Sequence, residues 1–206
     1  MSTSISPSVE ALRARFGDAI GRAAVIAGDT VVYVAADRAH EILAWLKTDP
    51  EQAFDYLTDI TAVEYRDPER PIELVYQLRS LRRRADLRVK VELEKGEELR
   101  MPSVYDLWRG ADWLEREVYD MFGVTFTGHP DLRRILMWET YTEGYPLRKD
   151  FPLRGQYTRA EQTRQALTTS PEAHYSTVEL AIARRWADLP EDTRDHLAPE
   201  RQEGPA

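Results

Sequence analysis

Two neighbouring runs of alternating residues constrain the fold more than any other part of the sequence. In each run large apolar side chains alternate with charged or polar ones, at Ile72, Leu74, Tyr76 and Leu78 and again at Leu87, Val89, Val91 and Leu93. A period of two places the apolar residues on one side of a strand and the polar ones on the other. The runs predict two strands of an antiparallel sheet with one buried and one wet face. Residues 82–84, all arginine, are expected to form a solvated turn between them.

The residues before these runs predict a regular succession of elements. Apolar side chains at helical spacing indicate a helix over residues 8–16, and two apolar runs around Gly28-Asp29 indicate a hairpin. A second helix is expected from an N-cap at Asp37 to residue 49, and a less regular strand over residues 56–65. The order helix, two strands, helix, three strands predicts an α+β fold, a two-layer sandwich with a mainly antiparallel sheet. No regular βαβ alternation supports a doubly wound nucleotide fold.

Helices and an extended C-terminal tail are expected to follow the sheet. Ser103 is a candidate N-cap for one helix, and a second is expected from about residue 112 to residue 122, with Gly123 at its C-terminal end. On this second helix, Arg116 and Asp120 are expected to form an outward-facing ion pair.

Four regions are expected along the chain. Residues 1–7 form a disordered lead-in and residues 8–127 the α+β domain. Frequent glycine and proline make residues 128–154 an extended docking segment that needs a surface to lie on. Residues 155–206 form a tail with one helix near 177–189.

Composition excludes several classes of function. The formal charge of −8 argues against a nucleic-acid partner, and the absence of cysteine excludes disulfides, thiolate nucleophiles and ordinary iron–sulfur ligation. No apolar stretch approaches the length of a transmembrane helix, so a membrane is expected to be reached only indirectly, through partners. A Gly-x-Gly-x-x-Gly motif is also absent, which makes a Rossmann-type NAD site unexpected.

Three stretches resemble one known family. They are SVYDLW at residues 103–108, EREVYDMFGVTFTGHPDLRRIL at 115–136 and GYPLRKDFPL at 144–153. Together they cover about a quarter of the chain and resemble the signature of the C-type subunit of the respiratory NADH-quinone oxidoreductase (complex I, NDH-1).

The resemblance implies a structural component of the peripheral arm of that complex. Such a component holds neither FMN nor an iron–sulfur cluster, which belong to partner subunits, and it is not expected to be an enzyme when isolated. Its partners would be chiefly the quinone-site subunit, designated D, with the iron–sulfur subunits designated B and I nearby, on the cytoplasmic side of the bacterial cell membrane. It would brace these subunits while the holoenzyme, a proton-translocating translocase, passes electrons from NADH to quinone.

The candidate site residues are therefore expected at subunit interfaces, and no catalytic, cofactor-binding or metal-binding residue is expected. They are Glu115, Glu117, Asp120, His129, Arg133, Arg134, Arg148, Lys149, Asp150 and Trp186. Glu115 and Glu117 lie about 200° apart around a helix and cannot converge on one substrate. The Gly-His-Pro sequence suits a tight turn whose imidazole bonds a carbonyl or carboxylate. Glu117 is either a partnered residue at the margin of the apolar stripe or an ordinary solvated one.

Two alternatives remain open at this point. One is the equivalent subunit of a membrane-bound hydrogenase or related dehydrogenase, whose sister proteins are similar in this region. The other is a free-standing hydrolase or lyase that uses Glu117 or Asp120.

Overall fold

The computed structural model describes residues 6–67, 69–95, 98–138, 141–153 and 155–169. These fall into two compact units, one ending at Gln156 and one beginning at Tyr157. Within the described residues, no helix is long and apolar enough to cross a membrane. Residues 1–5 of the lead-in expected at 1–7, the helix expected near 177–189 and the candidate Trp186 all lie outside the described residues; Ser6 and Pro7 are described and start α1.

The N-terminal elements follow the predicted order. Helix α1 (Pro7–Phe16) begins at Ser6, whose hydroxyl oxygen accepts a hydrogen bond from the backbone of Ser8. The short 3-10 helix η1 (Gly17–Ala19) leads into β1 (Ile20–Ile26), which forms a hairpin with β2 (Asp29–Val34).

The second helix does not begin as expected. A 3-10 helix, η2 (Ala36–Arg38), precedes α2 (Ala39–Thr48), and the N-cap of α2 is Arg38, which makes no side-chain capping bond. Asp37 is therefore not an N-cap, because the 3-10 turn moves the start of the α-helix beyond it.

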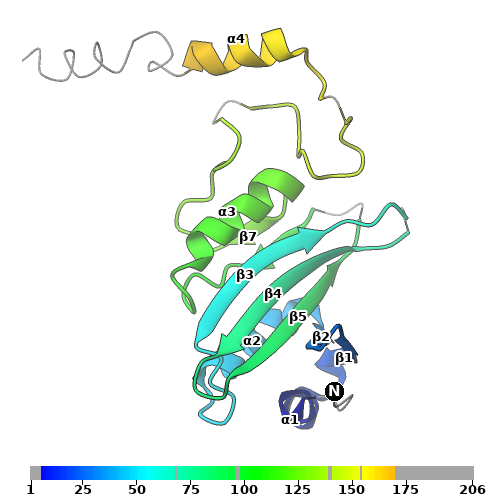
Figure 1. The fold of residues 1–206 in the computed structure, drawn as a ribbon, viewed down its shortest axis with the longest axis vertical. Helices are drawn as coiled ribbons and strands as arrows, with labels where there is room; N and C mark the ends of the chain where they lie inside the picture. Colours follow the sequence, from blue (N-terminus) through cyan, green and yellow to red (C-terminus); the bar gives the residue numbers. More distant parts are fainter. Residues whose placement is uncertain (1–5, 68, 96–97, 139–140, 154, 170–206) are drawn as a thin grey trace, which may run out of the picture. The chain divides into compact units, whose positions relative to one another are not determined.

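The main sheet has five strands in the order β1-β2-β5-β4-β3, where β3 is Tyr56–Val63, β4 is Ile72–Ser80 and β5 is Ala85–Leu93. All neighbours are antiparallel except β2 and β5. Helices α1 and α2 share a continuous apolar core with the strands, and α2 lies behind the sheet in Figure 1. The predicted α+β fold with a mainly antiparallel sheet is confirmed.

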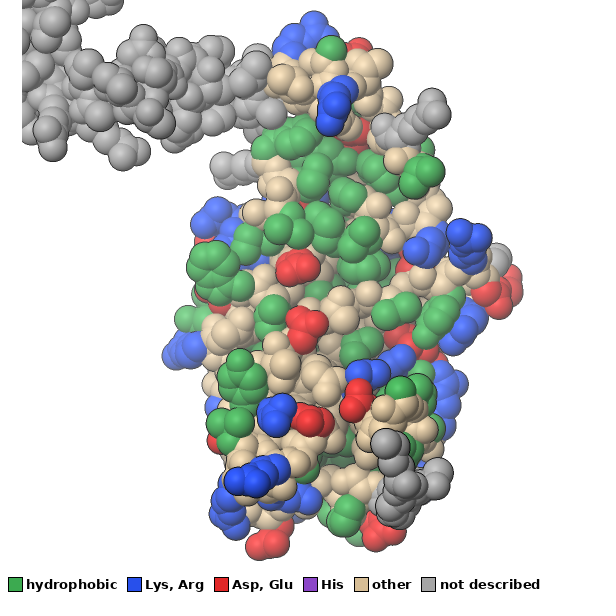
Figure 2. Space-filling model, viewed as in Figure 1, with side chains coloured by type: hydrophobic (Ala, Val, Ile, Leu, Met, Phe, Trp, Pro, Cys, Tyr) green, Lys and Arg blue, Asp and Glu red, His purple; other side chains and the backbone are tan. Residues whose placement is uncertain are grey.

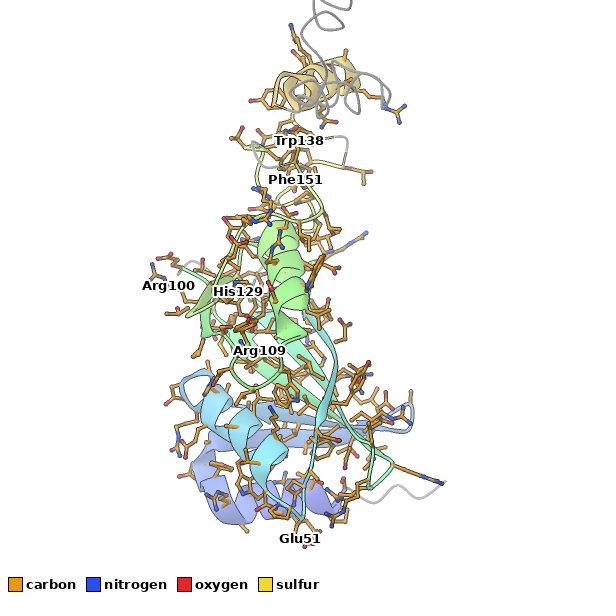
Figure 3. The ribbon with its side chains drawn as sticks, turned by 90° about the vertical axis from the view of Figure 1, so that its left-hand side faces the viewer. Glu51, Arg100, Arg109, His129, Trp138 and Phe151 are labelled. Atoms are coloured by element: carbon orange, nitrogen blue, oxygen red, sulfur yellow. The ribbon has the colours of Figure 1, made fainter. Side chains whose placement is uncertain are left out.

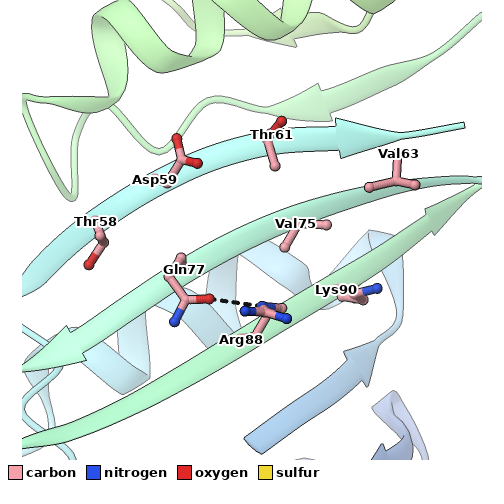
Figure 4. Close-up of a pocket in the computed structure, with 8 residues that line it drawn as sticks. All are labelled: Thr58, Asp59, Thr61, Val63, Val75, Gln77, Arg88 and Lys90. Atoms are coloured by element: carbon pink, nitrogen blue, oxygen red, sulfur yellow. Dashed lines mark hydrogen bonds between the residues drawn. The ribbon is translucent and has the colours of Figure 1, made fainter. Parts of the chain in front are cut away.

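The other face of the sheet is not as wet as the alternation predicts. Glu73 is only 1% exposed, because its carboxylate accepts hydrogen bonds from Tyr33 (3.0 Å), Tyr65 (2.8 Å) and Lys90 (2.6 Å). Long polar side chains thus cover this face in place of a second layer. A shallow hollow of about 380 Å³ over β3, β4 and β5 contains Gln77 bonded to Arg88 at 2.9 Å (Figure 4).

The turn between β4 and β5 is only partly solvated. Arg82 and Arg84 are exposed, but Arg83 donates to the hydroxyl of Ser8 and to the backbone carbonyl of Gln52. The middle arginine therefore ties this turn to the start of α1.

Helix α3 (Ala111–Phe122) packs against β3 and is flanked by a small parallel pair, β6 (Arg100–Pro102) and β7 (Thr125–Thr127). The expected helix capped by Ser103 does not form. The Ser103 hydroxyl instead bonds Glu115 and the backbone of Tyr105, which holds a turn. At the other end of α3, Gly123 has φ +80° and closes the helix, as its position predicts.

Beyond β7, the described residues up to 156 contain no further strand or helix. In the second unit, α4 (Arg159–Thr169) begins with a capping box, which was not among the predicted elements. The backbone of Thr158 donates to the Glu161 carboxylate at 2.9 Å, and the Glu161 backbone donates back to the Thr158 hydroxyl at 3.3 Å.

Candidate docking site on helix α3

A row of residues spaced four apart on α3 binds the extended segment, residues 128–154. The row consists of Asp112, Arg116 and Asp120, one helical turn from each other. Asp112 binds through its backbone carbonyl, and the other two bind through their side chains. The segment therefore runs beside α3 from its first turn to its last (Figure 3).

Arg116 and Asp120 do not form the outward-facing pair expected from their spacing. The guanidinium of Arg116 donates to the carbonyl oxygens of Arg133 (3.1 Å) and Arg134 (3.0 Å). Both members of the expected pair are buried. The expectation fails because this side of α3 faces another segment of the chain instead of water.

Asp120 holds the centre of the segment. One carboxylate oxygen accepts three consecutive backbone N–H groups, those of Ile135 (3.0 Å), Leu136 (2.7 Å) and Met137 (2.8 Å). The other oxygen accepts from Arg134 at 2.6 Å. Burial by itself would raise the pKa of Asp120, but these donors outweigh it and hold the pKa below its usual value.

Arg134 joins the outgoing and returning parts of the segment. Its guanidinium also donates to the carbonyl of Gly144 at 3.1 Å and lies over the rings of Tyr141 and Tyr145, 5.0 and 5.4 Å from their centroids. The ring of Tyr145 in turn lies so close to Gly123 that a Cβ atom there would be 2.4 Å from it. Gly123, which ends α3, thus also leaves space for the ring of Tyr145.

His129 occupies the turn at the start of the segment. Its buried Nε2 lies 3.1 Å from the carbonyl of Asp112, and its Nδ1 accepts a hydrogen bond from the backbone of Asp131 at 3.0 Å. The imidazole therefore bonds a carbonyl, as expected for this turn. Figure 3 shows His129 beside α3, while Trp138 and Phe151 lie beyond its C-terminal end.

The two glutamates of α3 point to different environments. Glu115 is fully buried against Ser103 and Val104, and Glu117 is exposed. They do not converge, as their spacing predicts. Glu117 is exposed in the isolated chain, and its contact with a partner subunit stays a prediction.

Residues 148–150 are only partly free for a partner. The backbone N–H of Lys149 donates to Glu64 at 2.8 Å, and the Nε of Arg148 lies 3.6 Å from the same carboxylate. The side chains of Lys149 and Asp150 are exposed. Glu64, which follows β3 and binds this part of the segment, has no sequence signal that distinguishes it from a solvated loop residue.

Exposed apolar side chains lie on α3 and along the segment. They are Trp113, Leu136, Leu147 and Leu153, each at least half exposed. Two of them are held in place by backbone hydrogen bonds to α3: Leu136 donates its N–H to Asp120, and Leu147 donates its N–H to the carbonyl of Met121. We call these four residues the apolar patch, and Figure 2 shows hydrophobic side chains gathered over this part of the molecule. None of the four was among the interface candidates predicted from the sequence.

Among the residues that the structure describes, no group of three or more His, Cys, Asp or Glu side chains is arranged to hold a metal ion. The buried carboxylates of α3 are occupied by hydrogen bonds within the chain.

Two solved structures have a fold similar to that of this chain, and at least one of them is a chain of a respiratory membrane complex. Over 61% of this chain and 96% of the other, the fold is similar to the trypsin-resistant fragment (1–134) of Nqo5, with 33% identity and a TM-score of 0.52. It is also similar to a chain of the membrane-bound sulfane sulfur reductase, an archaeal respiratory membrane complex, with 26% identity, a TM-score of 0.61 and coverage of 80% and 92%.

The sequence comparisons give the particular family. The model of the respiratory-chain NADH dehydrogenase 30 kDa subunit matches residues 32–157. The C-type subunit numbered 2 of the NADH-quinone oxidoreductase of Rhizobium etli is 46% identical over 155 residues, 74% of this chain and 81% of the relative. The C-type subunit from Brucella ovis is 44% identical over 144 residues, 70% of each chain. The chain belongs to the family of the 30 kDa, or C-type, subunit of respiratory NADH dehydrogenase.

Proposed function

We propose that this chain is a cofactor-free structural subunit of the peripheral arm of NADH-quinone oxidoreductase, and that it binds neighbouring subunits through the extended segment and α3. The holoenzyme transfers electrons from NADH to quinone, with FMN and iron–sulfur clusters in the partner subunits. The partners are chiefly the quinone-site subunit (D), with the iron–sulfur subunits (B and I) nearby, on the cytoplasmic side of the membrane. The role of this chain is to keep them at fixed separation.

One observation supports this proposal above the others. The extended segment lacks regular structure in its described residues, yet buried side chains of α3 bind its backbone at successive points. Binding through the backbone holds the segment's path while leaving apolar side chains outside, with Leu136 60% and Leu147 50% exposed; Trp113 on α3 is 64% exposed. An ordered surface with exposed apolar side chains is typical of a protein–protein contact.

A charge placed in the apolar patch tests the proposal. Leu136→Asp should lower the amount of assembled complex and leave the fold intact, because the side chain is already exposed in the free subunit. Leu81→Asp is the matched control, since Leu81 is 57% exposed but lies in the turn between β4 and β5. Native gels and NADH:quinone reductase activity of membranes would measure assembly. Equal assembly of the two variants would contradict the docking role.

A second candidate function is the equivalent subunit of another membrane-bound respiratory complex. The likeness to a chain of the sulfane sulfur reductase complex favours it. Purification of the complex followed by mass spectrometry of its subunits separates the two candidates. A flavin-bearing, NADH-oxidising module is expected only for the NADH-quinone oxidoreductase.

A further inference from the structure

Glu115 is a fully buried carboxylate that faces no nearby cation. Among the described residues, no Lys or Arg lies within ion-pairing distance of it, and the nearest basic atom is the Nε2 of His129, 4.0 Å away. That imidazole is already engaged elsewhere, because its Nδ1 accepts a backbone N–H from Asp131 and its Nε2 lies 3.1 Å from the carbonyl of Asp112. Among the described residues, no lysine or arginine therefore neutralises a negative charge on Glu115.

The carboxylate holds the turn that leads into α3. One oxygen accepts the Ser103 hydroxyl at 2.6 Å, and the other accepts the backbone N–H of Val104 at 2.7 Å. The Ser103 oxygen itself accepts the N–H of Tyr105 at 3.1 Å. Both carboxylate oxygens thus serve as acceptors, which suits the ionised form of Glu115.

A proton on Glu115 would disturb this arrangement. The oxygen that faces Val104 meets an N–H donor and has no acceptor there, so the proton must lie on the oxygen that faces Ser103. The hydrogen of the Ser103 hydroxyl would then lose its acceptor, and the carboxyl group would hold Val104 more weakly than a carboxylate does.

The other groups around Glu115 also disfavour its charge. Asp106, in the turn, and Asp112, on α3, add negative charge, while Tyr76 on β4 is fully buried. Burial raises the pKa of the Tyr76 phenol far above its usual range, so it remains a neutral hydroxyl. Its oxygen has no hydrogen-bond partner among the described residues. Burial is likewise the main cause that raises the pKa of Glu115 to about 7, against the hydrogen bonds from Ser103 and Val104.

We propose that Glu115 is a proton-binding site whose protonation loosens the turn at residues 103–105 from α3. The effect reaches the start of the extended segment, because the ring of Tyr105 lies 6.2 Å from that of His129. The contact between the turn and α3 is tight when Glu115 is ionised and weaker when it carries a proton.

The sign of the accompanying stability change follows from proton linkage. The folded chain keeps the proton up to about pH 7, while the unfolded chain loses it near the ordinary value of 4.5. The contribution of Glu115 to stability is therefore largest below the lower value, and it falls as pH rises through this window and levels off above about 7. The proposed loosening is local: the turn loses its bonds from Ser103 and Val104 while Glu115 stays buried, so the loosened state binds the proton at least as tightly as the tight one.

Two measurements on the full chain test the proposal. In a carbon-13 NMR titration of the glutamate carboxyl groups, one signal should titrate with a midpoint near pH 7. Glu115→Gln should remove that signal, and Glu117→Gln should leave it in place. A midpoint for Glu115 near the ordinary value of 4.5 would overturn the proposal, and this result does not depend on the folding of any variant.

Amide exchange measures the loosening itself. The protection factor of the Val104 amide, corrected for intrinsic exchange, should fall roughly 2- to 10-fold from about pH 8 to about pH 6, as expected for weakening of one hydrogen bond. In Glu115→Gln, whose side chain cannot ionise, it should not depend on pH. An unchanged protection factor in the unmodified chain, or the same fall in the variant, would also overturn the proposal.

Discussion

Asp120 lies at the point where α3 and the extended segment are joined most closely. A single carboxylate oxygen accepts three successive backbone N–H groups that would otherwise be unpaired in an irregular segment. Because the donors hold its pKa below the unfolded value, the stabilisation is complete above the unfolded pKa and is lost as pH falls through the folded one.

Asp120→Ala should therefore lower the free energy of unfolding by about 3–5 kcal/mol, since it leaves Arg134 without its buried partner. It should also make the chain sensitive to trypsin at Arg133 and Arg134. Asp150→Ala is the control, because the Asp150 side chain is 76% exposed and should change stability by no more than about 0.5 kcal/mol. Urea unfolding and limited proteolysis would measure both, and equal effects would contradict the role of Asp120.

Gly123→Ala should destabilise the chain by more than the roughly 1 kcal/mol that a left-handed backbone alone costs. The added Cβ would meet the ring of Tyr145, which packs against Arg134 and Tyr119. Gly128→Ala is the matched control, because Gly128 has a similar left-handed backbone (φ +86°) and open space around its Cβ position. Thermal melts compare the two, and addition of Tyr145→Ala should restore part of the loss. No restoration would show that the ring is not the obstacle.

At the scale of elements, the regular strands and the end of α3 were predictable, and the polar contacts of α3 were not. Alternation over residues 72–79 and 87–94 predicted β4 and β5, because every second side chain enters the same core. The prediction of an outward-facing pair of Arg116 and Asp120 was wrong, because a helical wheel treats any polar side of a helix as solvated. The prediction of a helix capped by Ser103 was wrong, because the Ser103 hydroxyl binds Glu115, which is twelve residues away.

The same limitation applies to Glu73, which alternation assigned to water. Burial alone would raise the pKa of this carboxyl, but hydrogen bonds from Lys90 and Tyr65 hold it below the usual value. Its stabilisation is therefore present above pH 4.5 and lost as pH falls through the folded value.

Glu73→Gln should lower the free energy of unfolding by about 3–5 kcal/mol, because it leaves Lys90 partly buried and without its carboxylate. It should also remove much of the acid sensitivity below pH 4.5. Glu92→Gln is the control, since that carboxylate pairs with Arg22 at the surface and contributes about 1 kcal/mol or less. Urea titrations at two pH values measure both effects. A loss as small as that of the control would contradict a structural role for the buried carboxylate.

At the scale of the molecule, the main apolar cluster among the described residues is built from residues before 138, although the extended segment continues to residue 154. A chain ending at residue 156 should therefore melt within a few degrees of the full chain. A chain ending at residue 127 should melt much lower, because it would lack the partners of Arg116 and Asp120 and would expose the side of α3 that the segment covers. Calorimetry of the three chains tests this, and a large loss for the chain ending at 156 would show that later residues contribute to the core.

The family could be identified from residues 103–153, and the docking role remains a proposal that these residues support. The sequence alone does not show which charged residues are already used within the chain. Arg134 and Asp120 were candidates for a partner, yet they bind each other, whereas Trp113 and Leu136 remain exposed. Charged residues draw attention in a sequence, but their pairing depends on contacts between distant segments.

The strand order also determines the course of events during folding. Val31 of β2 pairs with Arg88 of β5, so the N-terminal hairpin has no neighbouring strand until β3, β4 and β5 have been synthesised and brought together. Contacts between such distant residues form slowly, because the chain loses the entropy of closing a long loop before any hydrogen bond between the strands compensates for it. The first hairpin to leave the ribosome is thus among the last parts to be fixed in place, and the edge of β2 is open to wrong partners in the meantime.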